Sequence, residues 1–262
     1  MGCKVKDLRM LAVLSLLVLI CTKTRGRVRS GIIGGQEAKP HSRPYMVSIR
    51  VGGMHSCGGT LVQKQWVLTA AHCFPNLAKG AVTAVLGIHK LSAKLLPGQK
   101  FSIKGYFPHP NYNTTTKEND IMLLQLSRKV TLNAIMNVVK LPKKEQAIPL
   151  RTECSVAGWG RYQERSPPSD ALQELHVEIM DSRMCNNSRF WDGEIFESMI
   201  CIQSQKRNSA PCQGDSGGPL VCGKGMLVGV ISFSSKICTN KFKPSVVTAV
   251  PKFITWMKRT MA

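Results

Sequence analysis

The sequence predicts an all-β fold made of two similar units of roughly a hundred residues each. Three observations predict it: short apolar runs recur along the chain, Gly and Pro residues separate them, and a stretch rich in Lys and Pro, residues 127–152, divides them into two sets. Short strands with such turn residues between them are typical of a β-barrel or a β-sandwich. Residues 127–152 are then the crossing between the two units.

Each set contains several expected strands. In the first unit these are residues 45–49, 60–62, 66–69, 82–86, 101–103 and 121–126. In the second unit they are residues 154–157, 172–180, 199–202, 219–222, 226–233 and 246–250. With 262 residues and 43% apolar content, the chain can bury a core in each unit, and disordered and collagen-like chains are excluded.

The last segment, residues 251–261, departs from the strand pattern. Pro251 is a residue type that favours the first turn of a helix. After it in the sequence, apolar side chains recur at helical spacing: Phe253, Ile254, Trp256 and Met257. The sequence therefore predicts a short C-terminal helix that docks on the β structure.

The N-terminal segment has the features of a secretory signal peptide. Lys4, Lys6 and Arg9 precede an apolar run over residues 10–21, which is shorter than the roughly 20 residues that cross a bilayer. We expect a secreted chain without stable membrane association, and a multi-pass membrane protein is excluded. Four basic residues between positions 23 and 29 are unusual behind a cleaved signal, so a short uncleaved anchor is the alternative.

The chain is strongly basic, with 36 Lys and Arg against 15 Asp and Glu and a net charge of +21. Without residues 1–31, 29 basic and 14 acidic residues remain, a net charge of +15 over 231 residues. Such a charge favours polyanions, either sulfated glycosaminoglycans or nucleic acid, and charge alone does not choose between them. For an exported protein we expect granule proteoglycan or heparin-like polyanions and no nucleic acid, although a solvated basic face is the simpler interpretation of any single lysine.

Eight cysteines remain once Cys3 and Cys21 are assigned to the leader. They are Cys57, Cys73, Cys154, Cys185, Cys201, Cys212, Cys222 and Cys238. An even number in an exported chain predicts disulfides, although eight cysteines allow about a hundred pairings and the sequence alone selects none. The cysteines lack C-x-x-C spacing, which argues against a zinc ribbon or a thioredoxin-type site, and we expect no metal and no cofactor.

The segment 214–219 is the sharpest local motif, because Ser216 stands in it between Asp215 and two glycines. A serine hydroxyl becomes a nucleophile when a base takes its proton and N–H groups receive the developing oxyanion. Glycines on both sides let the backbone turn tightly and point N–H groups at a carbonyl. The motif therefore predicts a nucleophilic serine.

A base and an acid are available elsewhere in the chain. His72 follows the strand-like residues 66–68, and Asp120 stands at the start of the apolar run 121–124. A carboxylate at the mouth of an apolar strand is expected to be buried and to need a partner, and His72 is the natural one.

The three motifs, in the order His72, Asp120, Ser216, resemble the trypsin/chymotrypsin family of serine proteases. The resemblance runs from Ile32 to the C-terminal helix and implies a serine endopeptidase. By this resemblance His72 takes the proton of Ser216, Asp120 holds the imidazole, and the N–H groups of Gly214 and Ser216 form the oxyanion hole.

The resemblance implies a fold of two six-stranded antiparallel β-barrels packed together with a short C-terminal helix. The expected protease domain is residues 32–262, with barrels over about 32–130 and about 150–250 and the helix over 251–261. Residues 1–31 would be a signal peptide and a short propeptide. The family pattern also pairs the cysteines as Cys57–Cys73, Cys154–Cys222, Cys185–Cys201 and Cys212–Cys238.

Activation in this family implies that Ile32 becomes a new N-terminus, turns inward and pairs with Asp215. The residue before Ile32 is Gly31 and not the Lys or Arg of trypsin precursors. A trypsin-like activator could cut after Arg29, or a dipeptidyl peptidase could remove residues 30–31 as in granzymes. The sequence leaves the processing route open.

Substrate specificity is implied by the pocket positions of the family. Ala210 stands six residues before the nucleophile, where trypsin-like relatives carry an aspartate, so cleavage after Lys or Arg is not expected. Ser234 and Ser245 take positions where glycines admit flat rings, and they would narrow the pocket. With Pro211 and Ser232 this gives a narrow, uncharged pocket that suits Met first and Leu second, and it does not support a preference for acidic residues.

Local segments resemble the granzyme subfamily in particular, over residues 40–46, 183–191, 210–212 and 232–235. This implies a granule protease of cytotoxic lymphocyte-type immunity that acts as a monomer on protein substrates and meets serpin-type inhibitors. The alternatives are a secreted chymotrypsin-like protease of broad specificity, or a cationic glycosaminoglycan-binding protein on a protease scaffold. Asn113 and Asn186 head sequons, so we expect N-glycans there.

Overall fold

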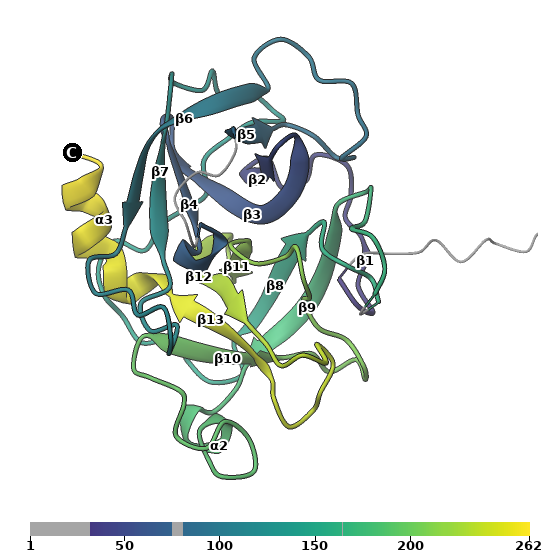
Figure 1. Ribbon diagram of the computed structural model, residues 1–262. Coiled ribbons are helices and arrows are strands. Elements are labelled where there is room, and N and C mark those ends of the chain that lie inside the picture. The colour runs from purple at the N-terminus through teal and green to yellow at the C-terminus, as the bar shows by residue number, and fades with distance from the viewer. Residues whose placement is uncertain (1–31, 75–80, 164) are drawn as a thin grey trace, which may run out of the picture.

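A computed structural model describes residues 32–74, 81–163 and 165–262 of the chain (Figure 1). The expected leader, residues 1–31, lies outside the described residues. In the described residues, no helix is long and apolar enough to cross a membrane.

The first half of the chain closes into a six-stranded antiparallel barrel. Its strands are β2 (Met46–Val51), β3 (Met54–Gln63), β4 (Trp66–Thr69), β5 (Val82–Leu86), β6 (Lys100–Pro108) and β7 (Met122–Leu126). They follow the order β2-β3-β4-β7-β6-β5 around the barrel. Alternate side chains such as Val47, Leu61 and Leu124 fill the interior and are wholly buried, which is why the strands read as short apolar runs in the sequence.

The second half forms a matching barrel. Its strands are β8 (Glu153–Gly158), β9 (Gln173–Ile179), β10 (Met199–Gln203), β11 (Pro219–Cys222), β12 (Met226–Phe233) and β13 (Ser245–Ala249). Pairing of β8 with β9 closes the ring β9-β10-β13-β12-β11-β8, and the short β1 (Gln36–Glu37) pairs with β9 from outside. The predicted fold of two six-stranded antiparallel barrels is confirmed.

The C-terminal helix joins the two barrels. It begins as the 3-10 turn η2 (Val250–Phe253) and continues as α3 (Ile254–Thr260) on the outer edge of the molecule (Figure 1). Met257 is wholly buried in a cluster that contains Leu123 of the first barrel and Val230 of the second. The predicted amphipathic helix therefore buries its apolar side in a core shared by both barrels.

Every expected strand corresponds to a strand of the structure: four match at both ends, namely β4, β5, β11 and β12, and the others have shifted ends. The sequence analysis did not predict β1, the 3-10 turn η1 (Ala71–Cys73) or the short helix α2 (Ser182–Cys185). Each of these has at most four residues, which is too short to show a periodic pattern.

The two barrels meet along the face that carries η1. The backbone N–H of Gly58 in β3 donates to the carbonyl of Ser216 at 2.8 Å, so a first-barrel strand directly supports the serine segment of the second barrel. The candidate catalytic residues therefore come from both halves of the chain and gather at their junction.

Candidate active site

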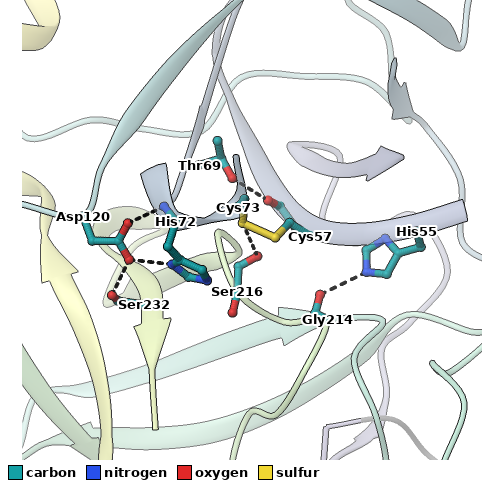
Figure 2. The surroundings of a disulfide bond; sticks show 10 residues. His55, Cys57, Thr69, His72, Cys73, Asp120, Gly214, Ser216 and Ser232 are labelled. Carbon is teal, nitrogen blue, oxygen red and sulfur yellow. Dashed lines mark hydrogen bonds and ion pairs between the residues drawn. A yellow bond between two sulfur atoms is a disulfide. The ribbon is translucent and has the colours of Figure 1, made fainter. Parts of the chain in front are cut away.

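Asp120 binds His72 through both of its carboxylate oxygens (Figure 2). Oδ1 accepts the backbone N–H of His72 at 2.8 Å, and Oδ2 lies 2.7 Å from the ring Nδ1. Asp120 is wholly buried, whereas the His72 side chain keeps 24% of its surface exposed. Because Nδ1 faces the carboxylate, the ring Nε2 is left free to act as a base.

Two hydroxyls fix Asp120 from the second barrel. Ser232 Oγ donates to Oδ2 at 2.5 Å, and Thr248 Oγ1 donates to the main-chain carbonyl of Asp120 at 2.9 Å. Burial alone would raise the pKa of Asp120, but the hydrogen bonds and charge of His72, together with the Ser232 hydroxyl, hold that pKa below its usual value. The carboxylate is therefore ionised at neutral pH and can stabilise a protonated imidazole.

Ser216 lies beside the His72 imidazole, on the side away from Asp120 (Figure 2). Both residues line one depression of about 290 Å³. The N–H groups of Gly214 and Ser216 donate to no acceptor within the described residues, so they are available for an oxyanion. Gly217 has φ +78, and a Cβ there would come within 2.5 Å of the Gly58 carbonyl, which explains why this motif needs glycine after the serine.

His55 anchors the oxyanion segment, a contact that the sequence analysis missed. Its Nε2 lies 3.0 Å from the Gly214 carbonyl, its Nδ1 lies 2.9 Å from Ser48 Oγ, and its ring meets Trp159 edge-on. Burial lowers the pKa of His55 to about 4, so the ring is neutral at physiological pH. No local sequence signal marks this histidine, because it stands in an ordinary strand far from Gly214 in the chain.

Asp215 is wholly buried and accepts the backbone N–H groups of Cys212 and Gly160 at 2.9 and 2.8 Å. Burial raises its pKa to about 7, against those two hydrogen bonds. Within the described residues no cation pairs with it. The predicted Ile32–Asp215 ion pair is not formed, because Ile32 is still joined to Gly31 and has no ammonium group, although its side chain is already wholly buried.

The predicted specificity pocket corresponds largely to the depression beside Ser216. Pro211, Ser232, Ser234 and Ser245 line it, and no carboxylate does. Ala210 lines an adjoining hollow, and its N–H donates to the Ile33 carbonyl at 3.0 Å. Pro211, Cys238 and Ser245 line both the depression and the adjoining hollow, so the placement of Ala210 at the floor of the pocket stays a prediction.

The eight cysteines form four disulfides, in the same pairs that the family resemblance implies. They are Cys57–Cys73, Cys154–Cys222, Cys185–Cys201 and Cys212–Cys238. The first joins η1 to β3 directly behind His72, and the last joins the segment before Ser216 to the far wall of the depression. Among the described residues no group of three or more His, Cys, Asp or Glu side chains is arranged to hold a metal ion.

The two sequons lie in different environments. Asn113 is exposed, and its Oδ1 accepts N–H groups of Thr115 and Thr116. Asn186 is half-buried, and its amide both donates to the carbonyl of Ile195 and accepts the N–H of Ile195, at 3.0 and 2.9 Å. The Asn113 amide nitrogen has no hydrogen-bond partner among the described residues, whereas that of Asn186 donates to the Ile195 carbonyl.

Known proteins resemble the chain over most of its length. The sequence profile of the trypsin family matches residues 32–257. Granzyme M of Homo sapiens is 48% identical over 230 residues, 87% of this chain and 88% of that protein, and Granzyme M of Rattus norvegicus is 46% identical over 251 residues, 94% and 96% of the two chains. Serine protease 57 of Rattus norvegicus is 40% identical, with 87% of this chain and 82% of that protein covered.

A solved structure agrees with the sequence relatives. Neuropsin, a serine protease of mouse brain, has a TM-score of 0.79 and 34% identity, over 88% of this chain and 100% of its own. The chain therefore belongs to the trypsin family of serine endopeptidases and is a protease of granzyme type.

Proposed function

We propose that the chain is a granule serine endopeptidase like granzyme M, which cleaves after Met or Leu in cytotoxic lymphocyte-type immunity. The proposal takes residues 1–31 as the leader and 32–262 as the protease domain. One observation carries it: His72, which is bound to buried Asp120, and Ser216 line a depression that has serines and a proline on its walls and no carboxylate.

In the proposed reaction His72 Nε2 takes the proton of Ser216 as Oγ attacks the substrate carbonyl. The N–H groups of Gly214 and Ser216 receive the oxyanion, and Asp120 stabilises the imidazolium that forms. His72 then protonates the leaving amine, and an acyl-enzyme on Ser216 remains. Water, deprotonated by the same imidazole, releases the product, so that no metal or cofactor takes part.

Activation is proposed to follow release of Ile32 as a free N-terminus. A new α-ammonium group would supply the cation that buried Asp215 lacks, and the pair would fix the backbone between Gly214 and Ser216. An isolated buried carboxylate is costly, so pairing it with the ammonium provides a driving force for ordering this segment.

The specificity proposal rests on the walls of the depression. The side chains of Ser234 and Ser245 occupy the space that a flat aromatic ring needs. These two residues and Pro211 are uncharged, so none of them forms an ion pair with a Lys, Arg or acidic side chain of the substrate. Lys236 is the one charged residue of the described lining. An unbranched, flexible side chain fits such a slot best, which favours Met over Leu.

The test is a peptide library varied at the residue before the cleaved bond, with the chain expressed from Ile32 and a Ser216→Ala control. We expect preferred cleavage after Met, then Leu, and a fall in kcat on the order of 10⁶-fold in the control. Preference for Phe or Tyr would keep the triad and favour the broad chymotrypsin-like alternative. Absence of turnover from a folded, correctly processed chain would favour the cationic binding protein.

A role in polyanion binding is proposed alongside catalysis, because exposed lysines lie close together in pairs, one of them with a member on the C-terminal helix. Lys258 Nζ donates to the carbonyl of Lys143 at 3.0 Å, and Lys140 Nζ lies 3.4 Å from the carbonyl of Lys224. All four are exposed, and within the described residues none of them forms an ion pair. This surface would hold granule proteoglycan through its sulfates while leaving Ser216 open to protein substrates and serpin-type inhibitors.

Heparin chromatography of the Ser216→Ala chain tests the polyanion proposal. Retention should fall steeply with salt, and a variant with Lys143 and Lys258 both changed to Ala should elute at lower salt than one with Lys94 and Lys104 changed to Ala. Equal elution of the two variants would mean that net charge alone governs binding.

A further inference from the structure

One lysine side chain binds the segment that follows the proposed new N-terminus. Lys206 Nζ donates to the carbonyl of Gly34 at 2.6 Å, across 172 positions of sequence. Lys206 is exposed and lies in the loop that runs from β10 towards the serine motif. Its position makes it a contact between the N-terminal segment and the part of the second barrel that shapes the active site.

The same loop holds this segment at two more points. The N–H of Ala210 donates to the carbonyl of Ile33 at 3.0 Å. Gly34 has φ +71, and a Cβ there would come within 2.1 Å of Ser209 Oγ, so the segment packs directly on the loop. Residues 33 and 34 are thus held by both ends of the loop 206–210. Of these three contacts, only the one from Lys206 is made by a charged side chain.

We propose that Lys206 is a positioning residue for catalysis: it clamps the freed N-terminal segment in its inserted position and so keeps the Ile32 ammonium against Asp215. The proposal rests on the proposed activation by a free Ile32. Inserting an ammonium group into the protein carries a desolvation cost that the ion pair offsets only in part. Inserted and released states are then close in free energy. The hydrogen bond is already formed while Ile32 is joined to Gly31, and it is lost when the segment leaves the loop, so it shifts the ratio towards the inserted state.

The clamp also bears on the substrate pocket. Its loop continues through Ala210 into Pro211, which lines the depression beside Ser216. Release of the segment would therefore loosen both the oxyanion segment and one wall of the pocket, and it would lower the fraction of active enzyme. We expect the loss to appear mainly in kcat, because the molecules that remain inserted bind substrate normally.

Lys206→Met tests the clamp, because it keeps most of the length of the side chain and removes the donor. Arg207→Met is the matched control, since the neighbouring cation is exposed and its side chain forms no hydrogen bond or ion pair among the described residues. Lys206→Arg should restore the bond. Losing a hydrogen bond of ordinary strength should lower the inserted-to-released ratio about fivefold. At high pH kcat falls as the Ile32 ammonium loses its proton and the segment is released, and in the variant this fall, the alkaline limb of the kcat profile, should begin about 0.7 pH unit lower.

The direction of this shift separates a clamp from a charge effect. Removing a positive charge near the Ile32 ammonium favours the charged amine and would move the limb up or leave it in place. A second readout is the rate at which cyanate modifies the Ile32 amine, followed by mass spectrometry of the N-terminal peptide. This rate should rise about fivefold in Lys206→Met, in step with the released fraction, and stay unchanged in Arg207→Met.

Two outcomes would overturn the clamp. One is an alkaline limb and a cyanate rate in Lys206→Met that match those of Arg207→Met. The other is a kcat lowered equally at every pH with no gain in modification, which would indicate a distorted pocket instead. If the parent chain itself shows no activity that Ser216→Ala abolishes, the proposed function fails, whereas an active parent with an unshifted variant refutes the clamp alone.

Discussion

Asp120 fixes both the backbone and the ring of His72, at 2.8 and 2.7 Å. Asp120→Asn would keep the shape but offer an amide in place of one carboxylate oxygen, which favours the wrong imidazole tautomer. We expect kcat at neutral pH to fall on the order of 10⁴-fold with little change in KM. Steady-state kinetics with a Met-containing peptide measures this, and a loss under tenfold would show that His72 is oriented by other contacts.

His55 supports the carbonyl of the residue whose N–H is proposed to bind the oxyanion, so its removal should act on the transition state. His55→Phe keeps the ring against Trp159 and removes both hydrogen bonds. We expect kcat to fall about tenfold or more while KM changes little, since removal of a direct oxyanion donor costs 10²–10³-fold and this effect is one step removed. A change confined to KM would contradict the role given to His55.

Ser245 stands on the wall of the depression, and its hydroxyl is buried without a partner among the described residues. Ser245→Gly should widen the slot and raise kcat/KM for Phe relative to Met by about tenfold or more, the discrimination expected of roughly one methylene-sized group. Competition between Met and Phe peptides in one reaction gives this ratio directly. An unchanged ratio would mean that another wall sets the width.

Local sequence patterns predict most of the strands and the order of the catalytic residues, whereas contacts between residues far apart in the sequence are not predicted by such patterns. Each barrel strand contains a short apolar run between turn residues, so its position is visible in the sequence, and the serine motif, His72 and Asp120 stand in a recognisable order. The contact of His55 with Gly214 and that of Lys206 with Gly34 depend on how loops meet across the folded chain, which no local period encodes. The backbone pairing of Ala210 with Ile33 is a contact of the same kind, because it joins residues that lie far apart in the sequence.

Asp215 makes stability depend on pH in the precursor, the chain in which Gly31 still precedes Ile32. Its pKa is about 7 in the folded protein against 3.8 for a free side chain, so the folded state binds the extra proton. The protonated Asp215 makes its full contribution to the free energy of unfolding below pH 4. This contribution is lost as the pH rises through 7, and the total loss is on the order of 4 kcal/mol. Urea unfolding of the Ser216→Ala precursor at pH 5 and pH 8 measures the difference.

The control for this prediction is the same precursor with Asp215→Asn, in which the amide does not titrate. Between pH 5 and pH 8, its free energy of unfolding should fall much less than that of the parent precursor. A chain that begins at Ile32 should also lose much of it, because its ammonium would stabilise the ionised carboxylate. An equal fall in all three proteins would place the titrating group elsewhere.

Glycosylation should distinguish the two sequons by the state of their amides. We predict an N-glycan at Asn113, whose amide nitrogen faces solvent, and none at Asn186, whose amide is bonded twice to Ile195. Thr115→Ala and Ser188→Ala remove the sequons and leave both asparagines in place. In chain secreted from mammalian cells, only Thr115→Ala should lose a glycan's mass, and a loss of mass in Ser188→Ala would show that Asn186 is modified before its loop closes on Ile195.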